Sequence, residues 1–436
     1  MKELLALLNQ LPEYRELKEA LKQGKRAVSL YGISSAHKAH FAAALQQDLG
    51  RPLAAICRDE SQARRFAADF ENLSGVPAAL LPAREYVFHN VEGSSREYEH
   101  RRLAALDQFV HARQPVLAAP VEALTMAAMP PQALEQAAFT LTADQEISLE
   151  QLEDALIAAG YVRCLAVEGG GQFSVRGGIA DIFPAGALRP VRAEFFGDCV
   201  DSLGEFDIQT QRRLQNSKEV RILPARETLP QLYPGGALAL AAELRRLAAK
   251  KGAAEALVQN LLQDAERLEQ QGLFAACDRY LPLIYPELTT ALDYLPADCL
   301  VLIDDSPGVR EAAGGFAYRV HEDIISLLEQ GCLVPGRAQF HIGFEQLKAA
   351  LLERQTVVMD SFLASSGGFE PQAIFSLTAK QLPAYNGSLE TALSDIRHYL
   401  GLGYQVFVLA GGPQRLENMA RLLEENQIAH SPEPQE

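Results

Sequence analysis

The spacing of apolar residues in the first 130 positions predicts a parallel β-sheet covered by helices. Short apolar runs, which are typical of buried strands, occupy residues 26–31, 53–57, 78–81 and 115–119. Stretches with apolar residues at helical spacing accompany them, and the clearest are 3–23, 61–73 and 96–111. Strands that alternate with helices indicate a parallel sheet with helices on both faces. We therefore expect an α/β fold for this part of the chain.

The pattern changes near residue 131, where shorter strands follow one another. A strand is predicted at 138–141, a helix at 149–160, and strands with alternating apolar and polar residues come next. The apolar run 220–224 then resumes a buried strand of the first domain. We infer an inserted α+β domain over 131–217, within a first domain that comprises 1–130 and 218–355.

The last eighty residues predict a small, separate α/β domain over 356–436. Three further apolar runs are typical of strands, and two stretches between and after them have helical spacing. The predicted strands are 356–359, 373–377 and 405–410, and the predicted helices are 389–400 and 413–426.

A phosphate-binding loop is expected after the strand 26–31, but its sequence has lost two functional positions. Against the pattern GxxxxGK[ST], the chain keeps the first glycine as Gly32 and the lysine as Lys38. His37 replaces the second glycine, where a side chain obstructs the wrapping of the backbone around phosphate, and Ala39 replaces the hydroxyl that binds magnesium. The strand-loop-helix context fits a P-loop fold of helicase type, whereas the chemistry is disabled.

The apolar run 299–303 ends in Asp304 and Asp305, which resemble the acidic end of a Walker B strand. Such carboxylates hold magnesium and orient water when a working P-loop faces them. Because the loop at Lys38 is degenerate, we expect both aspartates to be relics and predict no catalytic residue. The alternative is a nucleotidase that tolerates the altered loop and depends on Lys38 and Asp304.

Alternation along two later segments predicts a polar strand face that carries an aromatic ring. In 191–196 the odd positions are apolar and form a core face, whereas Arg192 and Phe196 point to the other side. The same parity in 173–176 turns Arg176 outward. If these two strands pair antiparallel, the three side chains form one patch of the residue types enriched at protein-protein hot spots. The alternative is that Phe196 packs under a neighbouring loop while the arginines are solvated.

Composition excludes several classes of protein. The chain has 40 Lys and Arg against 56 Asp and Glu, a net charge of −16, which argues against free duplex DNA as a direct ligand. Six cysteines never approach CxxC spacing, so we expect no metal site or disulfide framework, and reduced cysteines in a cytoplasmic protein. No apolar run is long enough for a signal peptide or a membrane span, so no membrane association is expected.

Four phrases within about 40 residues resemble the insertion domain of the UvrB-homology module. These phrases are VRGG at 175–178, DIFP at 181–184, EFFGD at 194–198 and FDIQTQR at 206–212. The module occurs in the excision-repair protein UvrB and at the amino end of transcription-repair coupling factors, the Mfd family. The resemblance implies that the exposed face of this domain binds UvrA, with Arg176, Arg192 and Phe196 at the contact positions.

The degenerate P-loop, together with the lack of a long aromatic hairpin, makes the chain more similar to the coupling factors than to UvrB. The resemblance then implies the amino-terminal part of a longer protein: a non-catalytic UvrB mimic that recruits nucleotide excision repair to stalled RNA polymerase. It implies no cofactor in this part, because ATP and Mg²⁺ belong to a translocase that acts on DNA, further along the family's chains. A damaged-DNA-binding protein like UvrB, or the P-loop nucleotidase above, is the alternative.

Overall fold

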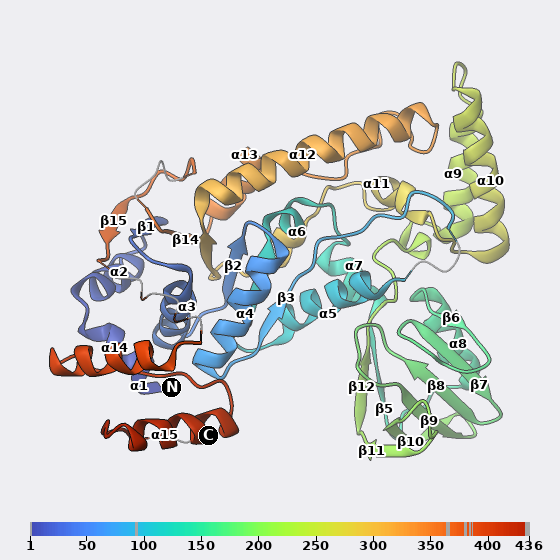
Figure 1. Ribbon diagram of the computed structural model, residues 1–436. Helices are drawn as coiled ribbons and strands as arrows, with labels where there is room; N and C mark the ends of the chain where they lie inside the picture. Colours follow the sequence, from blue (N-terminus) through green and yellow to red (C-terminus); the bar gives the residue numbers. More distant parts are fainter. Residues whose placement is uncertain are drawn as a thin grey trace. The chain divides into compact units, whose positions relative to one another are not determined.

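The computed structural model describes residues 2–91, 95–362, 367–378, 382, 385 and 387–431 (Figure 1). The chain divides into two compact units, one that comprises Lys2–Leu377 and a smaller one that begins at Thr378. The larger unit contains a seven-stranded sheet and, inserted in it, a second sheet. No helix in the described ranges has both the length and the apolar composition that crossing a bilayer requires.

The seven-stranded sheet is parallel throughout, as the alternation of strands and helices predicts. Its strand order is β15-β1-β14-β13-β2-β4-β3. The strands are β1 (Ala27–Tyr31), β2 (Leu53–Cys57), β3 (Ala78–Leu80), β4 (Val116–Pro120), β13 (Leu300–Asp304), β14 (Gln355–Asp360) and β15 (Ala373–Ser376). Strands β2, β4 and β13 are buried along their whole length, which explains why they are continuous apolar runs.

Helices cover both faces of this sheet and enclose two separate cores. One core contains side chains of α2 (Pro12–Lys22), α3 (Ser35–Leu49) and α4 (Glu60–Ser74), with α1 (Lys2–Leu7) beside them. The other core contains α5 (Glu97–His111), α6 (Val121–Thr125), α12 (Ser306–Glu329) and α13 (Phe344–Leu352). A helical hairpin of α9 (Gly236–Ala248) and α10 (Glu255–Gln271) joins this second core, as do α7 (Pro131–Ala137) and α11 (Leu281–Ile284).

The inserted part has its own sheet, with the strand order β11-β10-β9-β8-β7-β6. Its strands are β6 (Val162–Arg163), β7 (Gln172–Arg176), β8 (Ile179–Phe183), β9 (Val191–Phe196), β10 (Cys199–Phe206) and β11 (Arg213–Asn216). Helix α8 (Leu149–Ala158) covers one face, together with the antiparallel pair of β5 (Phe139–Thr142) and β12 (Glu219–Ile222). The side chains between these layers form a third core.

The prediction that 220–224 resumes a strand of the first domain is wrong. Residues 219–222 form β12, which pairs antiparallel with β5 and packs in the core of the inserted part. An apolar run in the sequence shows that a strand is buried, but it does not show which sheet buries it.

The prediction that a separate domain begins at residue 356 is also wrong for its first two strands. Strand β14 lies between β1 and β13, and β15 pairs with the other edge of β1, so both complete the large sheet. Figure 1 shows β14 and β15 beside β1. The smaller unit begins only at Thr378. Its helices α14 (Leu389–Gly401) and α15 (Pro413–Glu425) bury a small apolar cluster.

The strand predicted at 405–410 does not form. These residues are a nearly continuous apolar run, which is typical of a strand, but they take part in no β-pairing within the described part of the chain. A strand needs a neighbouring backbone to complete its hydrogen bonds, so strand propensity alone does not build one.

Candidate functional site

The inserted sheet has one face against its core and one face that is largely open. Strand β8 lies between β7 and β9, so the direct pairing of β7 with β9 that the sequence suggests is wrong. Directly opposed residues point to the same side of a sheet. Ser174, Asp181 and Arg192 are opposed across the three strands, and Arg176 lies two residues beyond Ser174. Although β8 separates β7 from β9, Arg176 and Arg192 therefore still lie on one face of the sheet, together with Phe196.

The Phe196 ring is exposed at the carboxyl end of β9. Its exposed fraction is 84%, and the turn that starts at Gly197, with φ of +62°, leads the chain into β10. The alternative in which the ring packs under a neighbouring loop is therefore wrong. Because no part of the described chain covers this ring, only a binding partner could bury it.

The two arginines converge on a single carboxylate, that of Asp181. Arg192 donates from Nε to Oδ1 at 2.6 Å and from Nη2 to Oδ2 at 2.9 Å, and Arg176 donates from Nη2 to Oδ2 at 2.8 Å. The hydrogen bond to Asp181 raises the pKa of Arg192 further above its ordinary value. The guanidinium of Arg192 also lies over the Phe206 ring, 4.4 Å from its centroid. Arg192 is thus held in place from two directions.

The two arginines differ in how far they reach solvent. The side chain of Arg176 is 56% exposed, whereas that of Arg192 is 17% exposed. The prediction that both arginines point away from the core is therefore right, but only Arg176 is well exposed to water. The pair thus consists of an exposed cation, Arg176, and a mostly buried one, Arg192.

Sequence reasoning missed Asp181, although a signal was present. Its side chain is only 2% exposed, in a strand whose neighbours Ala180 and Ile182 are fully buried. An aspartate at such a position must have a charged or hydrogen-bonding partner. The pattern shows that a partner is required, but only the pairing of β8 with both neighbouring strands shows that the partners are the two arginines.

Part of the open face is covered by a small apolar cluster at its other end. Val167, Phe183 and Phe206 form this cluster, with Cys164 and Ile208 beside them. Arg176 and Phe196 stay exposed on this face. We call the side chains of Arg176, Asp181, Arg192 and Phe196 the docking face.

Groups of the degenerate P-loop form hydrogen bonds with one another. Helix α3 begins at Ser35, and the amides of His37 and Lys38 already donate to the Ser34 carbonyl at 3.0 and 3.2 Å. The His37 ring forms a hydrogen bond of 2.9 Å with the Ser34 hydroxyl. These backbone donors are the groups that hold phosphate in a working loop. Here they are engaged in the first turn of the helix.

Lys38 forms an internal ion pair with the Walker B relic. Its Nζ lies 2.5 Å from Oδ1 of Asp304, and the two side chains are 3% and 4% exposed. Asp305 instead caps α12 by accepting from the Gly308 amide, and Ala39 is buried in the core. In this arrangement the ammonium group of Lys38 is engaged with an aspartate of the interior.

A loop passes over the first glycine of the motif. Gly32 has φ of +81°, and a Cβ at this position would lie 2.0 Å from the carbonyl oxygen of Leu377. The amide of Leu377 donates to the carbonyl of Tyr31 at 2.9 Å. The chain beyond β15 thus lies against the place where the loop bends.

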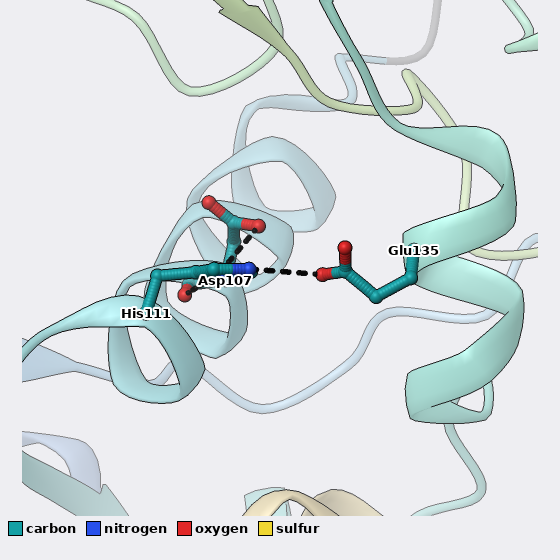
Figure 2. A group of neighbouring side chains, drawn as sticks. All are labelled: Asp107, His111 and Glu135. Atoms are coloured by element: carbon teal, nitrogen blue, oxygen red, sulfur yellow. Dashed lines mark hydrogen bonds and ion pairs between the residues drawn. The ribbon is translucent and has the colours of Figure 1, made fainter.

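A group of possible metal ligands lies where α5 and α7 approach each other. His111 contacts Asp107 on its own helix at 3.3 Å and Glu135 of α7 at 3.2 Å (Figure 2). The guanidinium of Arg221 lies 2.9 Å from Asp107 and 2.8 Å from Glu135. Both carboxylates therefore share one guanidinium of the protein, and the contacts form an ion-pair network between β12 and these helices.

Comparison with known proteins identifies the inserted part. Residues 139–227 match the family model of the UvrB interaction domain. The inserted part is thus similar to UvrB interaction domains, and an α/β scaffold carries it.

The whole chain is similar to transcription-repair-coupling factors. It is 25% identical to that of Bacillus subtilis (strain 168) and 24% identical to that of Staphylococcus aureus (strain MRSA252), each over 98% of this chain and 37% and 36% of the relative. The protein of that name from Myxococcus xanthus is 33% identical over 224 residues, which are 50% of this chain and 19% of the relative. The chain thus spans about a third of the length of the first two relatives. The resemblance to the coupling-factor family is confirmed.

Proposed function

We propose that this chain is the part of a transcription-repair coupling factor that binds UvrA, by presenting a surface like the one that UvrB uses. The observation that carries the proposal is the exposed Phe196 ring on the same sheet face as two ordered guanidinium groups, in the domain that matches the UvrB interaction family. Binding of UvrA at this face would recruit nucleotide excision repair to a stalled RNA polymerase.

The docking face suits an acidic and apolar partner surface. Phe196 would enter an apolar pocket, and complete burial of such a ring is worth roughly 1.5–3 kcal/mol. Arg176 retains donors that, within the described residues, have no protein partner, and a planar guanidinium matches a carboxylate. A buried aromatic anchor with an arginine beside it is the composition of a binding hot spot.

The proposal assigns no catalysis and no cofactor to this chain. The support is the Lys38–Asp304 pair, the amides engaged at Ser34, and the absence of a hydroxyl at Ala39. Hydrolysis of ATP with Mg²⁺, movement on DNA and contact with RNA polymerase are proposed to belong to the longer protein, beyond this chain.

The test is a calorimetric titration of the chain with purified UvrA. We expect Arg176→Ala and Phe196→Ala each to weaken binding by about 1–3 kcal/mol, because each removes an anchor. Leu188→Ala and Arg189→Ala are matched controls, because Leu188 is 97% exposed and the Arg189 side chain is 55% exposed in the loop before β9, at the opposite end from Phe196. Both controls should bind like the wild type.

Two results would contradict the proposal. Unchanged affinity in both Arg176→Ala and Phe196→Ala would show that UvrA binds elsewhere. Tight binding of a damaged duplex in fluorescence anisotropy, or ATP turnover that is lost in Lys38→Met, would favour the UvrB-like DNA binder or the nucleotidase instead.

A further inference from the structure

Asp181 occupies the centre of the docking face but has almost no contact with solvent. Both of its oxygens are engaged: Oδ1 accepts from Arg192, and Oδ2 accepts from Arg192 and Arg176. With an exposed fraction of 2%, the carboxylate cannot be a principal contact for a partner. Any effect that it has on binding must pass through the arginines.

The geometry gives Asp181 two tasks: it offsets the repulsion between Arg176 and Arg192, and it orients their side chains. Two guanidinium groups side by side repel each other, and a carboxylate between them removes this repulsion. The fork of Arg192 meets Asp181 edge-on through Nε and Nη2, and its Nη2 also donates to Oε1 of Gln211 at 2.8 Å. With Phe206 beneath the guanidinium, Arg192 has one defined orientation before any partner arrives.

Arg176 depends on Asp181 to a greater degree. In the part of the chain that the structure describes, the only hydrogen bond of its side chain is the one from Nη2 to Asp181. The long side chain is otherwise exposed and loses considerable rotamer freedom when it binds. The bond to Asp181 therefore selects the orientation in which the remaining donors face outward.

We propose that Asp181 is the positioning residue of the docking face: it orders Arg176 and Arg192 in advance, so that Arg176 meets a carboxylate of the partner while Phe196 enters an apolar pocket. This inference rests on the proposed function. It assigns Arg192 a supporting role, because its fork is already occupied within the protein.

Removal of the Asp181 charge has two opposing effects. The face becomes more positive, which favours an acidic partner at long range, but this attraction is screened by salt. The arginines also lose their common acceptor and repel each other. Salt screens this repulsion but does not restore the original geometry of the two side chains. We expect the second effect to dominate, so that Asp181→Asn binds UvrA about tenfold more weakly or worse at physiological ionic strength.

The experiment measures UvrA affinity for Asp181→Asn in two backgrounds, wild type and Arg176→Ala/Arg192→Ala. A positioning role predicts a loss of about tenfold in the first background and no further loss in the second. Asp201→Asn is the matched control, because it removes the same charge from an exposed position of β10 in the same sheet, and it should leave the affinity unchanged. Wild-type affinity for Asp181→Asn, or an equal loss in both backgrounds, would overturn the inference.

A measurement without UvrA separates this inference from the proposed function. In the wild-type chain with ¹⁵N-labelled arginine, the Nε–H of Arg192 should be protected from exchange with water, and Asp181→Asn should lose that protection. If the wild type does not bind UvrA, the proposed function fails while this signal still decides the role of Asp181. Should Asp181→Asn not fold, the wild-type spectrum is decisive: rapid exchange at Arg192 would refute positioning, and slow exchange supports it.

Discussion

Replacement of Lys38 by methionine tests whether the degenerate nucleotide site has become part of the structure. Methionine keeps most of the length and the apolar stem of lysine but removes the ammonium group. The carboxylate of Asp304 then remains in an interior position without its cation. In a working P-loop protein the same change would remove phosphate binding and leave the fold intact. Here we expect the stability to suffer instead.

The magnitude follows from the burial of the pair. Its two side chains are 3% and 4% exposed, so water cannot solvate the remaining charge. Loss of one partner of a buried ion pair costs about 3–5 kcal/mol. The part-exposed pair of Lys18 and Asp48, with 17% and 24% exposure, is the control, and Lys18→Met should cost about 1 kcal/mol or less.

The pH dependence has a definite sign. Burial raises the pKa of the Asp304 carboxyl, and Lys38 opposes that rise. Without Lys38 the folded-state pKa rises further above the unfolded value, so the folded variant takes up a proton where the unfolded chain does not. The stability deficit of Lys38→Met relative to the wild type is therefore greatest at neutral pH and shrinks as the pH falls through the raised pKa.

Urea denaturation and hydrogen exchange of α3 and β13 amides measure the effect. A second variant, Lys38→Met/Asp304→Val, replaces the whole pair with apolar groups and should recover most of the lost stability, because neither charge remains buried. The reasoning is refuted if Lys38→Met is as stable as the wild type at pH 7. It is also refuted if the double variant is as unstable as the single one.

Two further predictions concern positions where the fold constrains one residue. Gly32→Ala should lower the stability by about 2 kcal/mol or more, because it combines φ of +81° with a clash against the Leu377 carbonyl. Gly24→Ala is the control and should cost only about 1 kcal/mol, because Gly24 has the same φ but open space around it. Urea denaturation of both variants measures the difference, and equal costs would show that Leu377 is no obstacle. His100 is buried with its Nε2 3.1 Å from the Ala225 carbonyl oxygen, and burial lowers its pKa below the ordinary value of 6.5. The unfolded chain therefore binds the proton more readily, so stability should fall as the pH drops below about 6.5, and unfolding free energies at several pH values should show a shallower fall for His100→Gln; an identical slope in both proteins would contradict this.

The class of fold could be predicted from local patterns. The apolar runs and helical spacing of the first 130 residues determine which segments become strands and which become helices, because each pattern has the period of its own structure. The same alternation placed Arg192 and Phe196 on one side of a strand. The loss of a glycine at position 37, now His37, and of a hydroxyl at position 39, now Ala39, could likewise be recognised from the sequence alone.

The assignment of strands to sheets could not be predicted in this way. Strand β14 lies between β1 and β13, although more than 300 residues separate it from β1, and β12 pairs with β5 instead of joining the large sheet. An apolar run shows that a segment is buried but does not show which strand lies beside it. The segment 405–410 shows the same limit, because its strand pattern has no partner in the described chain.

By itself, the sequence determined most strands and helices of the first 130 residues, the decay of the nucleotide motifs and the side of β9 on which Phe196 lies. Only the tertiary structure decided that Lys38 would bind Asp304, 266 positions away, and that β8 would place Asp181 between two arginines. The physical reason is that periodicity is a property of neighbouring residues, whereas the pairing of buried charges depends on which distant segments the packing brings within hydrogen-bonding distance.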